Sequence, residues 1–157
     1  MSEYVKFAAE LAKKVILAGC GEIKGSGKPG LVRRAVDFPS LMLTLGFQPA
    51  FTFYVSKIDN YANVYRVYKY LKGELSDGSA ICSELERSEG SGYAGYVGVL
   101  LILLEKVGKV VKLTSEKPGE VFSVLLDLVT SVDFSTERVL LPYLEEVKKI
   151  MEALPYG

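Results

Sequence analysis

Apolar residues recur at helical spacing along almost the whole chain, and this repeat limits the fold more than any other feature. Phe7, Leu11 and Val15 fall on one stripe of residues 1–17, and charged residues take most of the other positions. This spacing predicts an amphipathic first helix. Residues 93–112 are apolar on nearly every side and predict a helix buried in the core. No stretch of the sequence has a convincing strand pattern.

Glycine, proline and capping residues divide this pattern. Residues 19–30 hold five glycines and predict a loop. Asp37 followed by Pro39 predicts a helix start, whereas Gly46 and Pro49 predict a bend in the apolar segment that follows. Together with residues 1–17 and 93–112, the predicted helices are 31–36, 39–57, 61–75 after Asn60, 79–87, 118–130 opened by Pro118, and 136–154 capped by Ser135 and kinked or split by Pro142. For a chain of 157 residues we therefore predict an all-α fold, a single domain over residues 1–157 with about six or seven helices.

The net charge of zero is the sum of two opposed halves. Residues 1–72 carry 11 basic and 5 acidic side chains, a net +6, and residues 73–157 carry 8 basic and 14 acidic ones, a net −6. Such an asymmetry is compatible with a basic face that binds nucleic acid, and equally with chance and solvated helix surfaces. Neutrality argues only against a chain that is basic all over its surface.

The composition excludes several kinds of chemistry. The chain has no histidine, which removes Ser-His-Asp and Cys-His catalysis and His-ligated zinc. Cys20 and Cys82 lie far apart in the sequence and predict two unpaired structural thiols in a reducing compartment. No pair of carboxylates sits in a motif-like apolar setting, so we expect neither an enzyme nor a bound cofactor or metal.

The sequence gives no sign of a membrane or secreted protein. The N-terminal segment mixes charged with apolar residues, unlike a signal peptide. The most apolar run, residues 97–104, is far shorter than the roughly 20 residues of a membrane span. We therefore expect a soluble, cytoplasmic protein.

Two stretches match the G-x-G-x-x-G pattern, at Gly25, Gly27 and Gly30 and at Gly90, Gly92 and Gly95. A dinucleotide-binding enzyme would need a strand before such a motif, and a helix is predicted there instead. Gly92, Gly95 and Gly98 recur every three residues, which favours close packing of the predicted helix against a neighbour.

Aromatic and basic residues interleave between residues 61 and 72. Tyr61, Tyr65, Tyr68 and Leu71 form a helical stripe that is either core or a platform for stacked bases. Further basic residues surround the glycine-rich loop, and gathered on one face they would bind a phosphodiester backbone. The candidate RNA-binding residues are Lys13, Lys14, Lys24, Lys28, Arg33, Arg34, Lys57, Arg66, Lys69 and Lys72.

Residues 31–57, LVRRAVDFPSLMLTLGFQPAFTFYVSK, resemble the signature of the small α-helical subunit of type III-B (Cmr module) CRISPR effector complexes. That signature has a basic residue, a proline opening an apolar helix, a glycine within it, an aromatic continuation and a closing Ser-Lys. Matching positions in this chain are Arg33 or Arg34, Pro39, Gly46, Phe53, Ser56 and Lys57.

The resemblance implies a non-catalytic subunit that stacks in copies within an RNA-guided, RNA-targeting complex and supports the guide and target RNA. Its implied partners are the other effector subunits, copies of itself, and both RNAs. With the charge pattern, we expect the basic half to face RNA, the acidic half to face protein, and copies to meet head to tail. The alternatives are a small subunit of another CRISPR effector class and a helical protein–protein adaptor.

Overall fold

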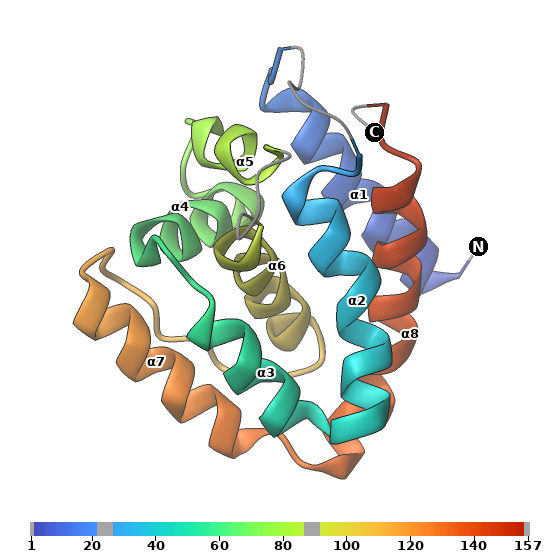
Figure 1. Cartoon of the computed structure of the whole chain (residues 1–157), viewed down its shortest axis with the longest axis vertical. Coiled ribbons are helices and arrows are strands. Elements are labelled where there is room, and N and C mark those ends of the chain that lie inside the picture. The colour runs from blue at the N-terminus through green and yellow to red at the C-terminus, as the bar shows by residue number, and fades with distance from the viewer. Residues whose placement is uncertain (1, 22–26, 87–91, 156–157) are drawn as a thin grey trace.

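A computed structural model gives the fold and describes residues 2–21, 27–86 and 92–155. All regular structure in these ranges is helical, as predicted (Figure 1). In chain order the helices are α1 (Glu3–Leu17), α2 (Gly30–Leu45), α3 (Phe47–Ser56), α4 (Tyr61–Lys72), α5 (Ser79–Glu84), α6 (Tyr93–Lys106), α7 (Pro118–Ser131) and α8 (Phe134–Glu152).

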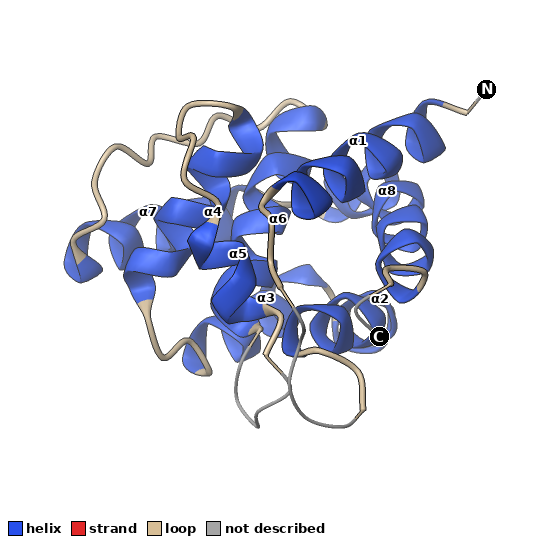
Figure 2. Ribbon diagram, turned by 90° about the horizontal axis from the view of Figure 1, so that it is seen from above, coloured by secondary structure: helices blue, strands red, loops and turns tan. Residues whose placement is uncertain are grey.

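Helix α6 is the centre of the molecule. Every residue from Tyr93 to Leu104 is buried, as its uniformly apolar sequence predicts. Helices α1, α2 and α8 pack together on one side of α6, and α3, α4 and α7 lie on the other (Figures 1 and 2). The buried residues of all eight helices in the described part form one continuous core.

The glycines of α6 allow this central position. A Cβ atom added at Gly95 would lie 2.7 Å from the Glu84 side chain, and one added at Gly98 would lie 2.9 Å from Val67. The predicted role of these glycines in close helix packing is confirmed. Gly92 likewise lies against the backbone of Gly30, so the second glycine motif packs on the first residue of α2.

The break between the second and third helices differs from the sequence prediction. Asp37 does not start a helix, because α2 runs unbroken from residue 30 to 45 with Pro39 inside it. Buried Phe38 and Met42 anchor this stretch in the core, which outweighs the one hydrogen bond that proline removes. The real break is Gly46, with a φ of 89°. Pro49 lies in the first turn of α3, where a missing N–H costs little, and it causes no break.

Further helix ends also differ from the prediction, and of the two effects predicted for Pro142 the split is excluded. Helix α6 ends at Lys106, and the connection to α7 is extended, with Val111 and Leu113 buried. Asp133, and not Ser135, caps α8, because its carboxylate accepts a hydrogen bond from the Thr136 N–H at 2.9 Å. Pro142 does not split α8, which continues to Glu152. The described part of the chain holds eight helices, slightly more than the predicted six or seven, and the break between the second and the third lies at Gly46 and not before Pro39.

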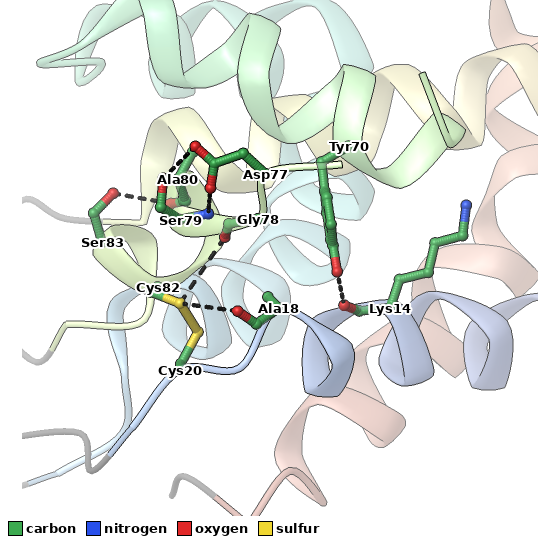
Figure 3. The surroundings of a disulfide bond; sticks show 10 residues. All are labelled: Lys14, Ala18, Cys20, Tyr70, Asp77, Gly78, Ser79, Ala80, Cys82 and Ser83. Atoms are coloured by element: carbon green, nitrogen blue, oxygen red, sulfur yellow. Dashed lines mark hydrogen bonds between the residues drawn. A yellow bond between two sulfur atoms is a disulfide. The ribbon is translucent and has the colours of Figure 1, made fainter. Parts of the chain in front are cut away.

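The two cysteines are paired, contrary to the sequence prediction. Cys20 follows α1, Cys82 lies on α5, and they form a disulfide bond (Figure 3). Their separation of 62 residues gave no sign of contact. The pairing results from packing of α5 against the end of α1, where a Cβ atom on Gly78 would lie 2.8 Å from the Cβ of Ala18. Within the described residues, no helix is long and apolar enough to cross a membrane.

Candidate nucleic-acid interface

The predicted RNA-binding residues fall in several separate places. Lys13 and Lys14 lie near the end of α1, Lys69 and Lys72 lie in the last turn of α4, and Lys14 bonds to the end of α4. Lys28, Arg33 and Arg34 lie before and within the first turn of α2. Lys57 ends α3, and Arg66 lies on α4. Lys24 lies outside the described residues.

The cations at the junction of α1 and α4 bind other parts of the protein. The Lys14 ammonium donates to the Leu71 carbonyl, and the Tyr70 hydroxyl donates to the Lys14 carbonyl at 2.6 Å. Lys69 pairs with Glu74 at 3.2 Å. Of the four, Lys13 is exposed and makes no ion pair with the described part of the chain. This junction is therefore held together largely by its own basic residues.

The Lys72 ammonium binds two other side chains of the protein. It donates to the Tyr68 hydroxyl at 3.1 Å and to the Glu105 carboxylate at 3.2 Å. The hydrogen bond to Tyr68, followed by that to Glu105, raises the pKa of Lys72 above its ordinary value. Lys72 consequently stays charged at any physiological pH.

Opposite charges from the two halves of the sequence meet across the helix contacts. Lys28 pairs with Glu152 at 2.9 Å, and Arg66 pairs with Glu116 at 3.0 Å. These pairs form because α1 and α2 pack on α8, and α4 packs on α6 and α7. The expectation that the basic and acidic halves form two separate faces is therefore wrong, since folding interleaves them.

The tyrosine stripe of α4 belongs mainly to the core. Tyr68 is fully buried and contacts other core residues, and Tyr61 and Tyr65 are half-buried against the same cluster. A fully buried ring offers no face to a base. Of the two interpretations that the sequence allowed, the structure therefore favours core packing.

A surface groove lies between α2 and α3, next to the predicted residue Arg34. It has a volume of about 410 Å³ and is lined by Arg34, Asp37, Ser40, Leu41, Thr44, Leu45, Phe53, Tyr54 and Tyr93. The break at Gly46 creates it, because α3 folds back beside α2 from that point (Figure 1). The Phe47 N–H then donates to the Glu137 carboxylate of α8, which replaces a capping side chain at the start of α3.

The inner wall of this α2–α3 groove is fixed by polar contacts. The Arg34 guanidinium lies 4.1 Å from the centre of the Tyr93 ring, and its Nη1 donates to the Tyr93 hydroxyl at 2.9 Å. The Tyr54 hydroxyl donates to the Arg34 carbonyl at 2.9 Å. Burial raises the pKa of Tyr54, so this hydroxyl remains a donor. Arg34 is thus a structural part of the wall.

The outer rim of the groove is open to solvent. Phe53 is 45% exposed, although the other aromatic residues of α3 are buried. The Lys57 ammonium lies 5.6 Å from the centre of the Phe53 ring, one helical turn further along. Tyr93 and Asp37 were not predicted as members of a site. Tyr93 lies 59 residues beyond Arg34, and no local sequence pattern predicts their contact.

Other kinds of site find little support in the described residues. No group of three or more cysteine, aspartate or glutamate residues is placed to hold a metal ion in that part of the chain. Gly25 and Gly90 lie outside the described residues, and the segment before the first glycine motif is helix α1, not a strand. A dinucleotide-binding turn requires that strand.

No protein-family model matches the chain, and no curated protein matches it. Among solved structures, the chain is similar to a chain in the cryo-EM structure of a type III-B Cmr-β complex bound to non-cognate target RNA. The TM-score is 0.67 at 23% identity, over 98% of this chain and 97% of the other. The two chains share one fold. The resemblance that residues 31–57 indicated is therefore confirmed at the level of the fold, from end to end.

Proposed function

We propose that the chain is a non-catalytic small subunit of a type III-B Cmr effector complex, a CRISPR RNA-guided complex that targets RNA. The observation that carries this proposal is the similarity to a chain of the Cmr-β complex over nearly the full length of both chains. The signature-like segment 31–57 supports it independently, because it forms α2, the Gly46 break and α3. Such a subunit would act in the cytoplasm with the other effector subunits.

We further propose that exposed cations of this chain support the RNA of the complex. Lys13 and Lys57 are exposed and make no ion pair with other described residues. Lys28 and Arg66 are about half exposed, and exposed ion pairs contribute only about 0–1 kcal/mol, so RNA phosphates can displace their carboxylate partners. Lys14, Arg34, Lys69 and Lys72 shape the surface and add positive charge. Arg33, next to Arg34 on α2, is half-buried, and Lys24 belongs to the same proposal.

Head-to-tail stacking of copies fits the distribution of exposed apolar residues. Leu17, at the end of α1, and Phe134, at the start of α8, are both highly exposed. These helix ends lie at opposite ends of the long axis of the molecule (Figure 1). Leu43 is also exposed and lines one surface pocket together with Phe134, which extends the apolar surface there. Distinct apolar surfaces at two ends allow a heterologous contact that repeats along one direction.

The RNA role is tested by target-RNA titrations of the assembled complex at two salt concentrations. The variant K13E/K57E should lower affinity, and the control K112E/K117E, which makes the same charge change at exposed lysines outside the candidate set, should lower it less. Affinity should fall steeply with salt. Equal affinities for both variants and the unmodified complex would instead indicate a protein–protein adaptor.

A further inference from the structure

We infer that the α2–α3 groove binds one unstacked base of single-stranded RNA, with Phe53 as the stacking surface and Lys57 as the contact to the adjoining phosphate. This inference rests on the proposed function and specifies one mode of RNA contact. The groove volume, about 410 Å³, falls in the roughly 300–1,000 Å³ range of small-molecule sites.

Phe53 has the properties of a stacking platform. Its ring lines the groove and is 45% exposed, whereas Phe47, Phe51 and Tyr54 on the same helix are buried. Stacking of a base on an aromatic ring does not depend on base identity, since every base has a π face. The Lys57 ammonium lies 5.6 Å from the centre of the Phe53 ring and is exposed. It can therefore contact a phosphate beside the stacked base.

Charge along the groove sets the orientation of the nucleotide. Asp37 lines the groove with a side chain that is 62% exposed, and its nearest carboxylate oxygen lies 3.8 Å from Arg34 Nη1. This ion pair with Arg34 leaves the Asp37 carboxylate largely exposed, so it can also accept a hydrogen bond from a base amino group, and its negative charge repels phosphate. The phosphate therefore faces Lys57, whose ammonium lies beside the Phe53 ring and outside the groove lining. Arg34 is only 13% exposed and holds the wall in place against Tyr93.

The same charges favour RNA over an apolar peptide as the occupant. An apolar peptide side chain would fill the space between Leu41 and Leu45, but it would give the Lys57 ammonium no anion and the Asp37 carboxylate no donor beyond Arg34. A nucleotide offers a ring to stack on Phe53, a hydrogen-bond donor to Asp37 and a phosphate anion to Lys57. The Asp37 carboxylate favours a cytosine, which presents its N4 amino group, over a uracil, whose N3–H donor lies between two carbonyl oxygens that the carboxylate repels.

Binding of fluorescently labelled oligo(C) and oligo(U) RNA to the isolated chain, followed by anisotropy, tests the inference. F53A should weaken binding of both by about 5- to 100-fold, and F53Y, which keeps the ring, should restore it. The matched control is F122A, at a ring that is 42% exposed on α7, and it should leave affinity unchanged. D37N should reduce the preference for oligo(C), and thermal unfolding should show that each variant is folded.

The outcomes separate this inference from the proposed function. Equal RNA affinity of F53A and F122A, or no binding of single-stranded RNA by the unmodified chain, would overturn the groove as a base site. If F53A instead impairs self-association or entry into the complex without changing RNA affinity, the groove binds protein and the inference is also wrong. In none of these cases would incorporation of the unmodified chain into a Cmr complex be affected.

Discussion

Replacing both cysteines by serine should lower stability strongly while leaving the fold intact. The Cys20–Cys82 bond closes a loop with a sequence separation of 62. Loop-closure entropy for that separation gives the bond a stabilising contribution of about 4 kcal/mol at 25 °C, acting through the unfolded chain. For a chain of this size, such a loss lowers the melting temperature by about 8–16 °C.

The native structure around the bond should persist without it. The Tyr70 hydroxyl still donates to the Lys14 carbonyl at 2.6 Å, and Gly78 still packs on Ala18 (Figure 3). Both contacts hold α4 and α5 near the end of α1. The helical circular dichroism spectrum of C20S/C82S should therefore equal that of the unmodified protein at 25 °C.

Denaturant unfolding with and without reductant measures the effect. Reductant should lower the unfolding free energy of the unmodified protein toward that of C20S/C82S and should not change the variant. Equal stability of the oxidised protein and the variant would refute the entropic reasoning. A thiol assay that finds two free cysteines in the native protein would refute the pairing itself.

Three further predictions concern the core. G98A should destabilise by about 1–3 kcal/mol, because its Cβ would lie 2.9 Å from Val67, whereas G119A, with nothing within 4 Å, should not; denaturant unfolding compares them. Y96F should raise the melting temperature, since the buried Tyr96 hydroxyl has no hydrogen-bond partner among the described residues, and an unchanged or lower value would show that it has one. Burial raises the pKa of Glu84 above its ordinary value of 4.5. The stabilising contribution of the protonated carboxyl is therefore complete below pH 4.5 and is lost as pH rises through the raised pKa. The unmodified protein should lose stability relative to E84Q over that pH range, and parallel profiles of stability against pH would contradict this.

The helices were predictable from local patterns, but their ends depended on contacts made elsewhere in the chain. The stripe of α1 and the apolar sequence of α6 fix those helices through spacing alone. The start of α3 depends on Glu137, 90 residues away, which no local pattern reveals. Asp37 and Pro39 have the spacing of a helix start. The prediction failed because burial of Phe38 and Met42 keeps α2 continuous through them, and a local sequence pattern does not show that burial.

The candidate site was less predictable than the fold, because charge and exposure are set by long-range packing. Composition located the basic residues, but not the pairing of Lys28 with Glu152 across 124 residues. It likewise did not reveal that Arg34 is held against Tyr93. Phe53 and Lys57 were identified through the resemblance, and only the structure shows that Phe53 lines a groove and that the Lys57 ammonium lies beside its ring.

Purification of the tagged chain from its native cells, followed by native mass spectrometry, tests the central claim most directly. The account predicts a complex that contains the other type III-B Cmr subunits, a guide RNA and more than one copy of this chain. A chain that purifies alone, or with partners but without guide RNA, would contradict it.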